Sequence, residues 1–143
     1  MLFRREWTDD DMIMLRAEIC DGRSLFSTGV YVGFDQLATA AEGLNRFKTH
    51  IYGGLFNIRF GEFGCEYASG ALDFRFHFVA QSKLLVRVQA ESEFNVFQDR
   101  QLASATTMFL VSEPCLLDNF VLTFDSFAVG GAEVAELEGI QWT

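Results

Sequence analysis

The feature that most constrains the fold is a strict alternation of apolar and polar residues near the middle of the chain. Residues 72–78 read Leu-Asp-Phe-Arg-Phe-His-Phe. Because successive side chains of a β-strand point to opposite faces, this run predicts a strand with an apolar face and a polar face. A sheet with one buried and one solvated face is typical of antiparallel architectures. We therefore expect the phenylalanines to pack in the core.

Further segments of strand character surround this run and are joined by short turns. Residues 12–20 and 24–32 flank an Asp-Gly-Arg turn and predict a hairpin. The remaining strands are expected at residues 56–60, 84–94 and 104–111. A short extra strand is expected around residues 65–68, and the polar stretch 95–101 is expected to form a loop.

The first segment with helical spacing covers residues 35–50, where apolar residues recur at intervals of three and four. Asp35 is the expected N-cap, and Gly53-Gly54 is the expected stop. Gly43 lies inside the pattern and is expected to weaken the helix by about 1 kcal/mol relative to alanine.

A second helix is expected over residues 114–128, because an apolar stripe at helical spacing follows Pro114. With the strands, the two helices predict an α+β fold: an antiparallel sheet of about six strands with both helices packed on one face. We expect a single domain over residues 1–143, with the acidic C-terminal tail 129–143 packed on it.

The charge is distributed unevenly along the chain. Residues 1–100 hold 11 basic and 14 acidic side chains, a formal charge of −3, whereas the residues after Arg100 hold six carboxylates and no basic side chain, a charge of −6. This asymmetry disfavours binding to nucleic acid or an anionic membrane and favours a cationic protein partner or solubility alone. We expect the six carboxylates to share one solvated surface: Glu113, Asp118, Asp125, Glu133, Glu136 and Glu138.

Two further patterns bear on the compartment and on metal binding. The apolar runs are too short to span a membrane, and residues 1–7 are too soon charged for a secretory signal, so a cytoplasmic location is expected. Cys20, Cys65 and Cys115 are widely spaced and form no CxxC pair. We expect buried free thiols and no metal site.

Residue patterns that could support catalysis are weak. His50 near the end of the first helix and His77 on the polar face of a strand have no marked nucleophile beside them. Asp118 and Asp125 share a helix face but are more simply explained as solvated residues. The run Asp9-Asp10-Asp11 lacks the glycine and distal glutamate of a calcium loop. We therefore predict no enzyme activity, no catalytic residue and no cofactor.

Three features between residues 34 and 128 carry a family resemblance. A helix with leucine and phenylalanine spacing, Phe34–Phe47, precedes a strand pair, Ala71–Phe76 and Leu84–Gln89. A later strand ending in Met108–Val111 continues through Ser-Glu-Pro into the terminal helix. In this layout the chain resembles bacterial immunity proteins of the WapI type and related uncharacterised families. The resemblance implies a non-enzymatic antitoxin, which binds a cognate toxin domain and blocks its active site.

Charge predicts where such a partner would bind. Many toxins of this kind are basic nucleases, and an acidic inhibitor is steered towards them electrostatically. An aromatic side chain is a suitable anchor at the centre of an interface. The expected partner-binding residues are Glu91, Glu93, Asp99, Glu133, Glu136, Glu138 and Trp142.

Other functions stay open at this point. Phenylalanine-rich strands that enclose an apolar cavity would make a small-molecule-binding domain, and another kind of protein-interaction domain is equally compatible with the composition. Enzyme activity would require His50 or His77 to meet a carboxylate or a thiol in a cleft. Exposed strand edges could also pair two copies into a homodimer.

Overall fold

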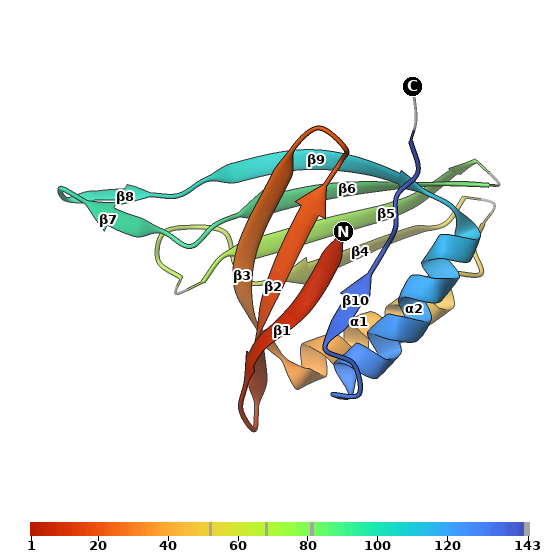
Figure 1. The fold of residues 1–143 in the computed structure, drawn as a ribbon, viewed down its shortest axis with the longest axis horizontal. Helices are drawn as coiled ribbons and strands as arrows, with labels where there is room; N and C mark the ends of the chain where they lie inside the picture. Colours follow the sequence, from red (N-terminus) through yellow and green to blue (C-terminus); the bar gives the residue numbers. More distant parts are fainter. Residues whose placement is uncertain (52, 68, 81, 142–143) are drawn as a thin grey trace.

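The computed structural model describes residues 1–51, 53–67, 69–80 and 82–141, and its strands and helices are shown in Figure 1. The α+β prediction is confirmed, but the single sheet of about six strands is wrong. The described residues form ten strands in two four-stranded antiparallel sheets and a two-stranded ribbon. In chain order the elements are β1 (Leu2–Thr8), β2 (Met12–Cys20), β3 (Leu25–Gly33), α1 (Phe34–Phe47), β4 (Leu55–Phe60), β5 (Ala71–Ala80), β6 (Lys83–Glu91), β7 (Asn95–Phe97), β8 (Arg100–Leu102), β9 (Ala105–Ser112), α2 (Pro114–Ala128) and β10 (Val134–Glu136).

Sheet A has the strand order β10-β1-β2-β3 and contains the predicted hairpin. Its inner face is apolar, because alternate residues of β2, from Ile13 to Ile19, are fully buried. Strand β1 pairs with β2 but has no regular alternation, since its register shifts between Arg5 and Trp7. A bulge of this kind inserts an extra residue and breaks the period of two.

Sheet B has the strand order β4-β5-β6-β9 and contains the alternating run of residues 72–78 in β5. Phe74, Phe76 and Phe78 are at most 2% exposed, whereas Arg75 and His77 on the opposite face are exposed. The predicted orientation of this strand is confirmed. Strand β6 ends at Glu91, three residues before the expected end of that strand.

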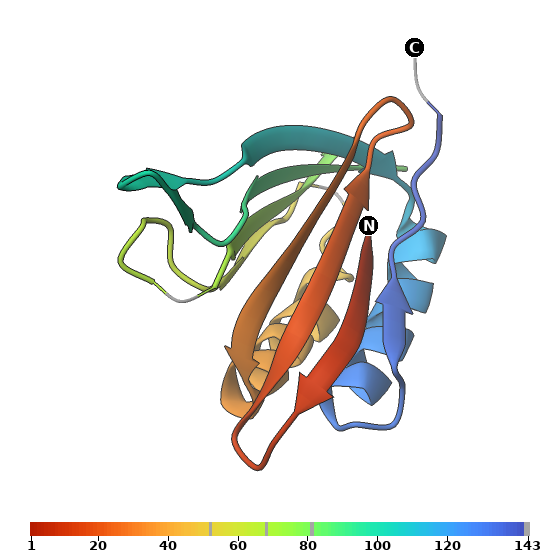
Figure 2. The same ribbon diagram turned by 60° about the vertical axis from the view of Figure 1, so that its left-hand side comes forward.

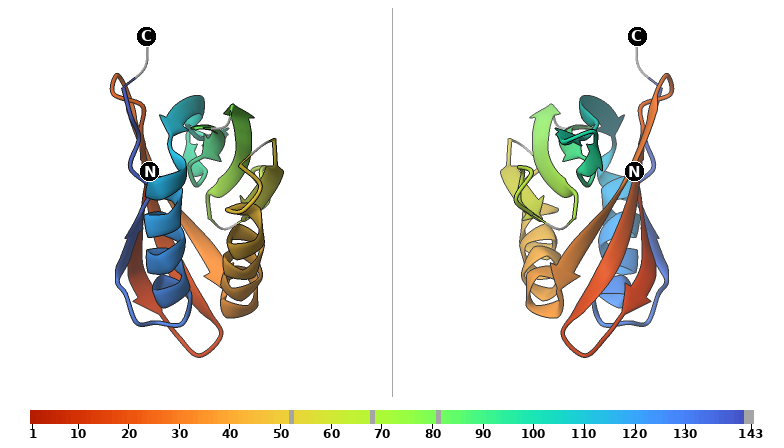
Figure 3. Two further views of the ribbon diagram at one scale, coloured as in Figure 1. Left: turned by 90° about the vertical axis from the view of Figure 1, so that its right-hand side faces the viewer. Right: turned by 90° about the vertical axis from the view of Figure 1, so that its left-hand side faces the viewer.

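The two sheets pack with their apolar faces inward, and their strands cross instead of running alongside each other (Figures 1 and 2). The helices lie side by side on the inner side of sheet A, where sheet B does not cover it (Figure 3). Phe3 of β1 joins these layers, because its ring contacts Phe74 of sheet B and Phe124 of α2. Two layers form because each set of strands has one apolar face that must be covered.

Both helices form where predicted, but α1 ends at Phe47, three residues before the expected end, and its N-cap differs. The N-cap of α1 is Gly33, not Asp35, which is exposed in the first turn. Gly33 N–H donates to Gln36 Oε1 at 2.9 Å, so the side chain at the third helical position caps the helix. Helix α2 begins at Pro114 as predicted.

The segment expected to be a loop at 95–101 is instead a short ribbon, in which β7 pairs with β8. It extends from one end of sheet B, away from the helices (Figure 1). Its turn has positive φ at Gln98 (47°) and Asp99 (67°), the conformation that closes a two-residue hairpin. The short strand expected around residues 65–68 is not formed by residues 65–67, and residue 68 lies outside the described ranges.

The tail after α2 contacts both sheets. Strand β10 pairs with β1, and Leu137 N–H donates to the carbonyl of Met1 at 2.8 Å. Further along, Ser112 Oγ donates to the carbonyl of Glu138 at 2.6 Å, and Ile140 N–H donates to that of Val111 at 2.8 Å. These bonds hold the described part of the tail against β1 and β9, and Trp142 lies outside the described residues.

Candidate functional site

The acidic residues expected to bind a partner occupy two separate regions. Glu93 precedes the β7-β8 ribbon, and Asp99 lies in its turn. Glu133 precedes β10, Glu136 ends it and Glu138 follows it, and Figure 1 shows this strand beside the helices, away from the β7-β8 ribbon. Glu91 ends β6 and is already occupied, because its carboxylate accepts from Gly64 N–H at 2.9 Å. The fold thus separates residues that the charge pattern had grouped.

Glu133, Glu136 and Glu138 form the denser acidic group, which we call the acidic edge. All three are exposed, and within the described residues no side-chain nitrogen of a lysine or arginine lies within 4.0 Å of their carboxylate oxygens. Glu136 and Glu138 line a groove of about 320 Å³ against α2, with Leu116 and Val134 also in its walls. Burial lowers the pKa of the Met1 α-amino group, and the charge of Glu136 acts in the opposite direction.

The six carboxylates beyond Arg100 do not share one surface, contrary to expectation. Asp125 on α2 faces α1 and is half-buried. Both of its oxygens accept from Asn45 Nδ2, at 2.8 and 3.0 Å. Asp118 is exposed on the same helix. The spacing of seven residues predicts that Asp118 and Asp125 share a face of α2. It cannot show that α1 packs against the C-terminal half of α2, where Asp125 lies.

The residues considered for catalysis or metal binding are not assembled into a site. Among the described residues there is no group of three or more His, Cys, Asp or Glu side chains that could hold a metal ion. His50 and His77 are exposed and lie on separate segments, His50 after α1 and His77 on β5. The expectation of buried thiols is wrong, because Cys20, Cys65 and Cys115 are all exposed.

The phenylalanine-rich strands pack against other rings. The Phe47 and Phe78 rings stack with centroids 4.9 Å apart, and Phe3 meets Phe74 edge-on at 5.3 Å. These rings account for the burial of β5 by ordinary core packing. They point to the inner side of sheet B and line no part of the hollow on its outer side.

The outer face of sheet B carries a group of arginines that sequence reasoning did not single out. Arg75 of β5 and Arg87 of β6 are directly opposite each other in the register. The adjacent row across the sheet consists of Arg59, Asp73, Gln89 and Thr107. We call these two rows the arginine face. Alternation in the sequence predicts that each arginine points outward, but only the register shows that they are neighbours.

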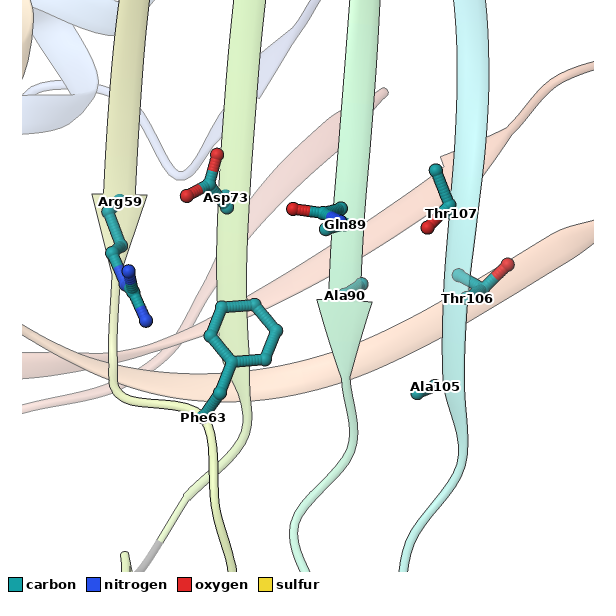
Figure 4. Close-up of a pocket in the computed structure, with 8 residues that line it drawn as sticks. All are labelled: Arg59, Phe63, Asp73, Gln89, Ala90, Ala105, Thr106 and Thr107. Atoms are coloured by element: carbon teal, nitrogen blue, oxygen red, sulfur yellow. The ribbon is translucent and has the colours of Figure 1, made fainter.

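A hollow of about 500 Å³ opens on this face beside the second row. Figure 4 shows Arg59 and Phe63 on one side of it, with Asp73, Gln89 and Thr107 along the strands. The guanidinium of Arg59 lies 5.1 Å from the centroid of the Phe63 ring, a cation–π distance. The hollow therefore combines a cation, a carboxylate, an amide, hydroxyls and an aromatic ring.

Comparisons of the chain with models of protein families, with curated proteins and with solved structures found no match. Among the described residues, neither helix is both long and apolar enough to cross a lipid bilayer. The acidic edge and the arginine face are the two surface features that point to a function.

Proposed function

We propose that this chain is a non-enzymatic binding domain of the immunity type, which docks a cationic toxin domain on its acidic edge. The observation that carries the proposal is the set of three exposed carboxylates, Glu133, Glu136 and Glu138, none of which forms an ion pair with a lysine or arginine among the described residues. The charged side chains of sheet A provide a contrast, because Arg4 pairs with Glu18 and Arg16 with Glu6.

The position of these carboxylates supports a protein partner over a small cation. Strand β10 is the edge strand of sheet A, and an edge strand presents backbone groups that an added strand can pair with. The adjacent groove is lined by apolar Leu116 and Val134 as well as by Glu136 and Glu138. A basic side chain of the partner could place its stem on the apolar wall and its charge beside the carboxylates.

The proposal that the partner is a toxin rests on the resemblance of residues 34–128 to immunity proteins. The net charge of −9 supports a cationic partner. An acidic surface raises the association rate with a basic protein, and this effect weakens as salt is added. Blocking the partner's active site requires binding alone. No catalytic group of this chain takes part.

The test is co-expression with the product of the neighbouring reading frame, followed by a binding measurement with the purified pair. We expect this chain to protect cells from that product and to bind it, with an affinity that falls as ionic strength rises. A chain that neither protects nor binds would overturn the immunity role.

A charge-neutral variant tests the acidic edge itself. Glu133→Gln, Glu136→Gln and Glu138→Gln together should weaken binding by about tenfold or more at low salt, because steering and charge pairing are lost. The matched control neutralises three exposed carboxylates elsewhere: Asp10→Asn, Glu42→Gln and Glu66→Gln. Equal losses in both triple variants would assign the effect to net charge and refute this docking surface.

A further inference from the structure

The two sheets each contain a pair of arginines that face each other across neighbouring strands, but only one pair is neutralised. On sheet A, Arg4 and Arg16 are opposite in the register, and each has a glutamate within 3.3 Å. On sheet B, Arg75 and Arg87 are opposite in the same way. No carboxylate among the described residues lies within 4.0 Å of either guanidinium.

Like charges directly opposite each other on a sheet are destabilising. The cost rises when a polar atom is also buried without a partner, and the Nε atom of Arg87 is buried with no hydrogen-bond acceptor among the described residues. Asp73 Oδ1 is likewise buried and without a donor. Asp73 is two residues from Arg75 on the same face of β5, yet it forms no ion pair with that arginine.

The surroundings suit a small ligand. The hollow of about 500 Å³ begins at the next row of side chains, where the Phe63 ring offers a stacking surface and Gln89 and Thr107 offer hydrogen bonds. A volume of several hundred Å³ is in the range that holds small organic molecules. The arginine pair and the hollow are adjacent on one face, so a single molecule can reach both.

We propose that the outer face of sheet B binds a small organic anion, whose carboxylate or phosphate lies between Arg75 and Arg87 and whose planar body occupies the hollow beside Phe63. Cross-strand neighbours have their Cβ atoms about 5 Å apart, so both guanidinium groups can reach one anionic group. Guanidinium binds carboxylate and phosphate through paired hydrogen bonds. The anion relieves the repulsion between the arginines by lying between their guanidinium groups.

The site is independent of the acidic edge, and so is its test. The natural ligand is replaced by three probes at constant ionic strength: inorganic phosphate, benzoate and phenyl phosphate, with benzyl alcohol as the neutral comparison. Binding is followed by NMR through the Nε–Hε signals of the arginines. We expect saturable shifts of the Arg87 signal with all three anions, the tightest binding with phenyl phosphate, and no saturation with benzyl alcohol.

Matched variants separate this site from general attraction to positive charge. Arg75→Gln with Arg87→Gln should weaken binding of phenyl phosphate by about tenfold or more, because charge-assisted hydrogen bonds are lost. The same change at Arg4 and Arg16, the neutralised pair on sheet A, should leave binding unchanged. Phe63→Leu should remove the advantage of phenyl phosphate over inorganic phosphate. A variant that unfolds is identified by circular dichroism.

Two results would overturn the proposal. One is the absence of saturable shifts with all three anions up to tens of millimolar, the range in which weak sites still saturate. The other is an equal loss in the two arginine variants. Asp73→Asn adds a measurement with a defined direction: removing this negative charge should tighten anion binding. Weaker binding would instead mean that Asp73 holds the ligand through a donor, which excludes an anion at that position.

Discussion

At the level of single residues, the close approach of α1 to sheet B depends on the absence of a side chain at Gly43. A Cβ atom at this position would overlap the Phe56 ring at Cζ and lie 2.6 Å from Cε1. Phe56 cannot easily move away, because its ring stacks on those of Phe47 and Phe76. The glycine that the helical pattern treats as a weakness is therefore a packing requirement.

Gly43→Ala should lower the free energy of unfolding by about 1–2 kcal/mol, since overpacking outweighs the gain in helix propensity of about 1 kcal/mol. Urea denaturation measures the change. In a Phe56→Ala background the space is free, and the same substitution should become stabilising. A double-mutant cycle then gives the coupling between the two positions. Stabilisation by Gly43→Ala in the otherwise unchanged chain would contradict the steric argument.

Asp9 stabilises the turn between β1 and β2 by a mechanism that depends on pH. Its Oδ1 accepts from the N–H groups of Asp11 (2.8 Å) and Met12 (2.9 Å), and these bonds lower the pKa of the carboxyl below 3.8. A carboxyl with a lowered folded-state pKa stabilises the fold above about pH 4, and its contribution is lost as the pH falls through the folded-state value. The carboxylate is fully exposed, so the effect is confined to this acidic range.

The prediction for Asp9 is a titration midpoint below that of a model peptide, measured by NMR on its side-chain carboxyl carbon. Asp9→Asn keeps an acceptor oxygen for both N–H groups but has no charge to titrate. The melting temperature of the variant should therefore fall less below pH 4 than that of the native chain. Asp10→Asn serves as the neighbouring control. Identical acid profiles for the native chain and Asp9→Asn would refute the role of the carboxylate.

At the level of elements, the two sheets are joined where β3 passes the start of β5. Gly70 N–H donates to the carbonyl of Gly29 at 3.0 Å, and Thr28 Oγ1 donates to that of Glu91 at 2.9 Å. A Cβ atom on Gly70 would overlap Thr28 Oγ1 and lie 2.5 Å from the Glu91 carbonyl oxygen. The obstacle here is backbone, which moves less readily than the end of a side chain.

Gly70→Ala should therefore lower the free energy of unfolding by about 3 kcal/mol, near the upper end of the usual cost of overpacking. Gly139→Ala is the matched control, because the nearest atom to its added Cβ would be 3.4 Å away. The control should change stability by less than about 0.5 kcal/mol. The free energy of unfolding of both variants is measured by chemical denaturation. Equal effects would contradict the close contact between the sheets at Gly70.

The elements that the sequence predicts correctly are those whose period persists. Strand β5 alternates apolar and polar residues over most of its length, and the two helices repeat their apolar spacing over several turns. In all three, the residues that the pattern predicts to be buried are buried. Strand β1 was missed because a bulge interrupts its alternation, and β7, β8 and β10 have only three residues each, too few to show a period. The pair Arg75 and Arg87 was also beyond prediction, since it depends on the register across the turn between β5 and β6.

At the level of the whole molecule, the C-terminal segment connects two strands that are far apart in the sequence and belong to different sheets. Strand β10 adds to β1 at the edge of sheet A, and the residues after it bond to β9 in sheet B. Leu137, between these two attachments, is fully buried and belongs to the core that both sheets and both helices share. We therefore expect both sheets to lose stability together when this segment is weakened.

Leu137→Ala tests this coupling. The substitution should lower the free energy of unfolding by about 2–5 kcal/mol, the usual cost of deleting a buried leucine side chain. Val129→Ala, at a position 84% exposed, should have little effect. Hydrogen exchange of amides in β2 and β6 should accelerate together, because the segment contacts both sheets. Faster exchange in sheet A alone would mean that the sheets unfold separately and that the tail stabilises only the edge to which β10 is paired.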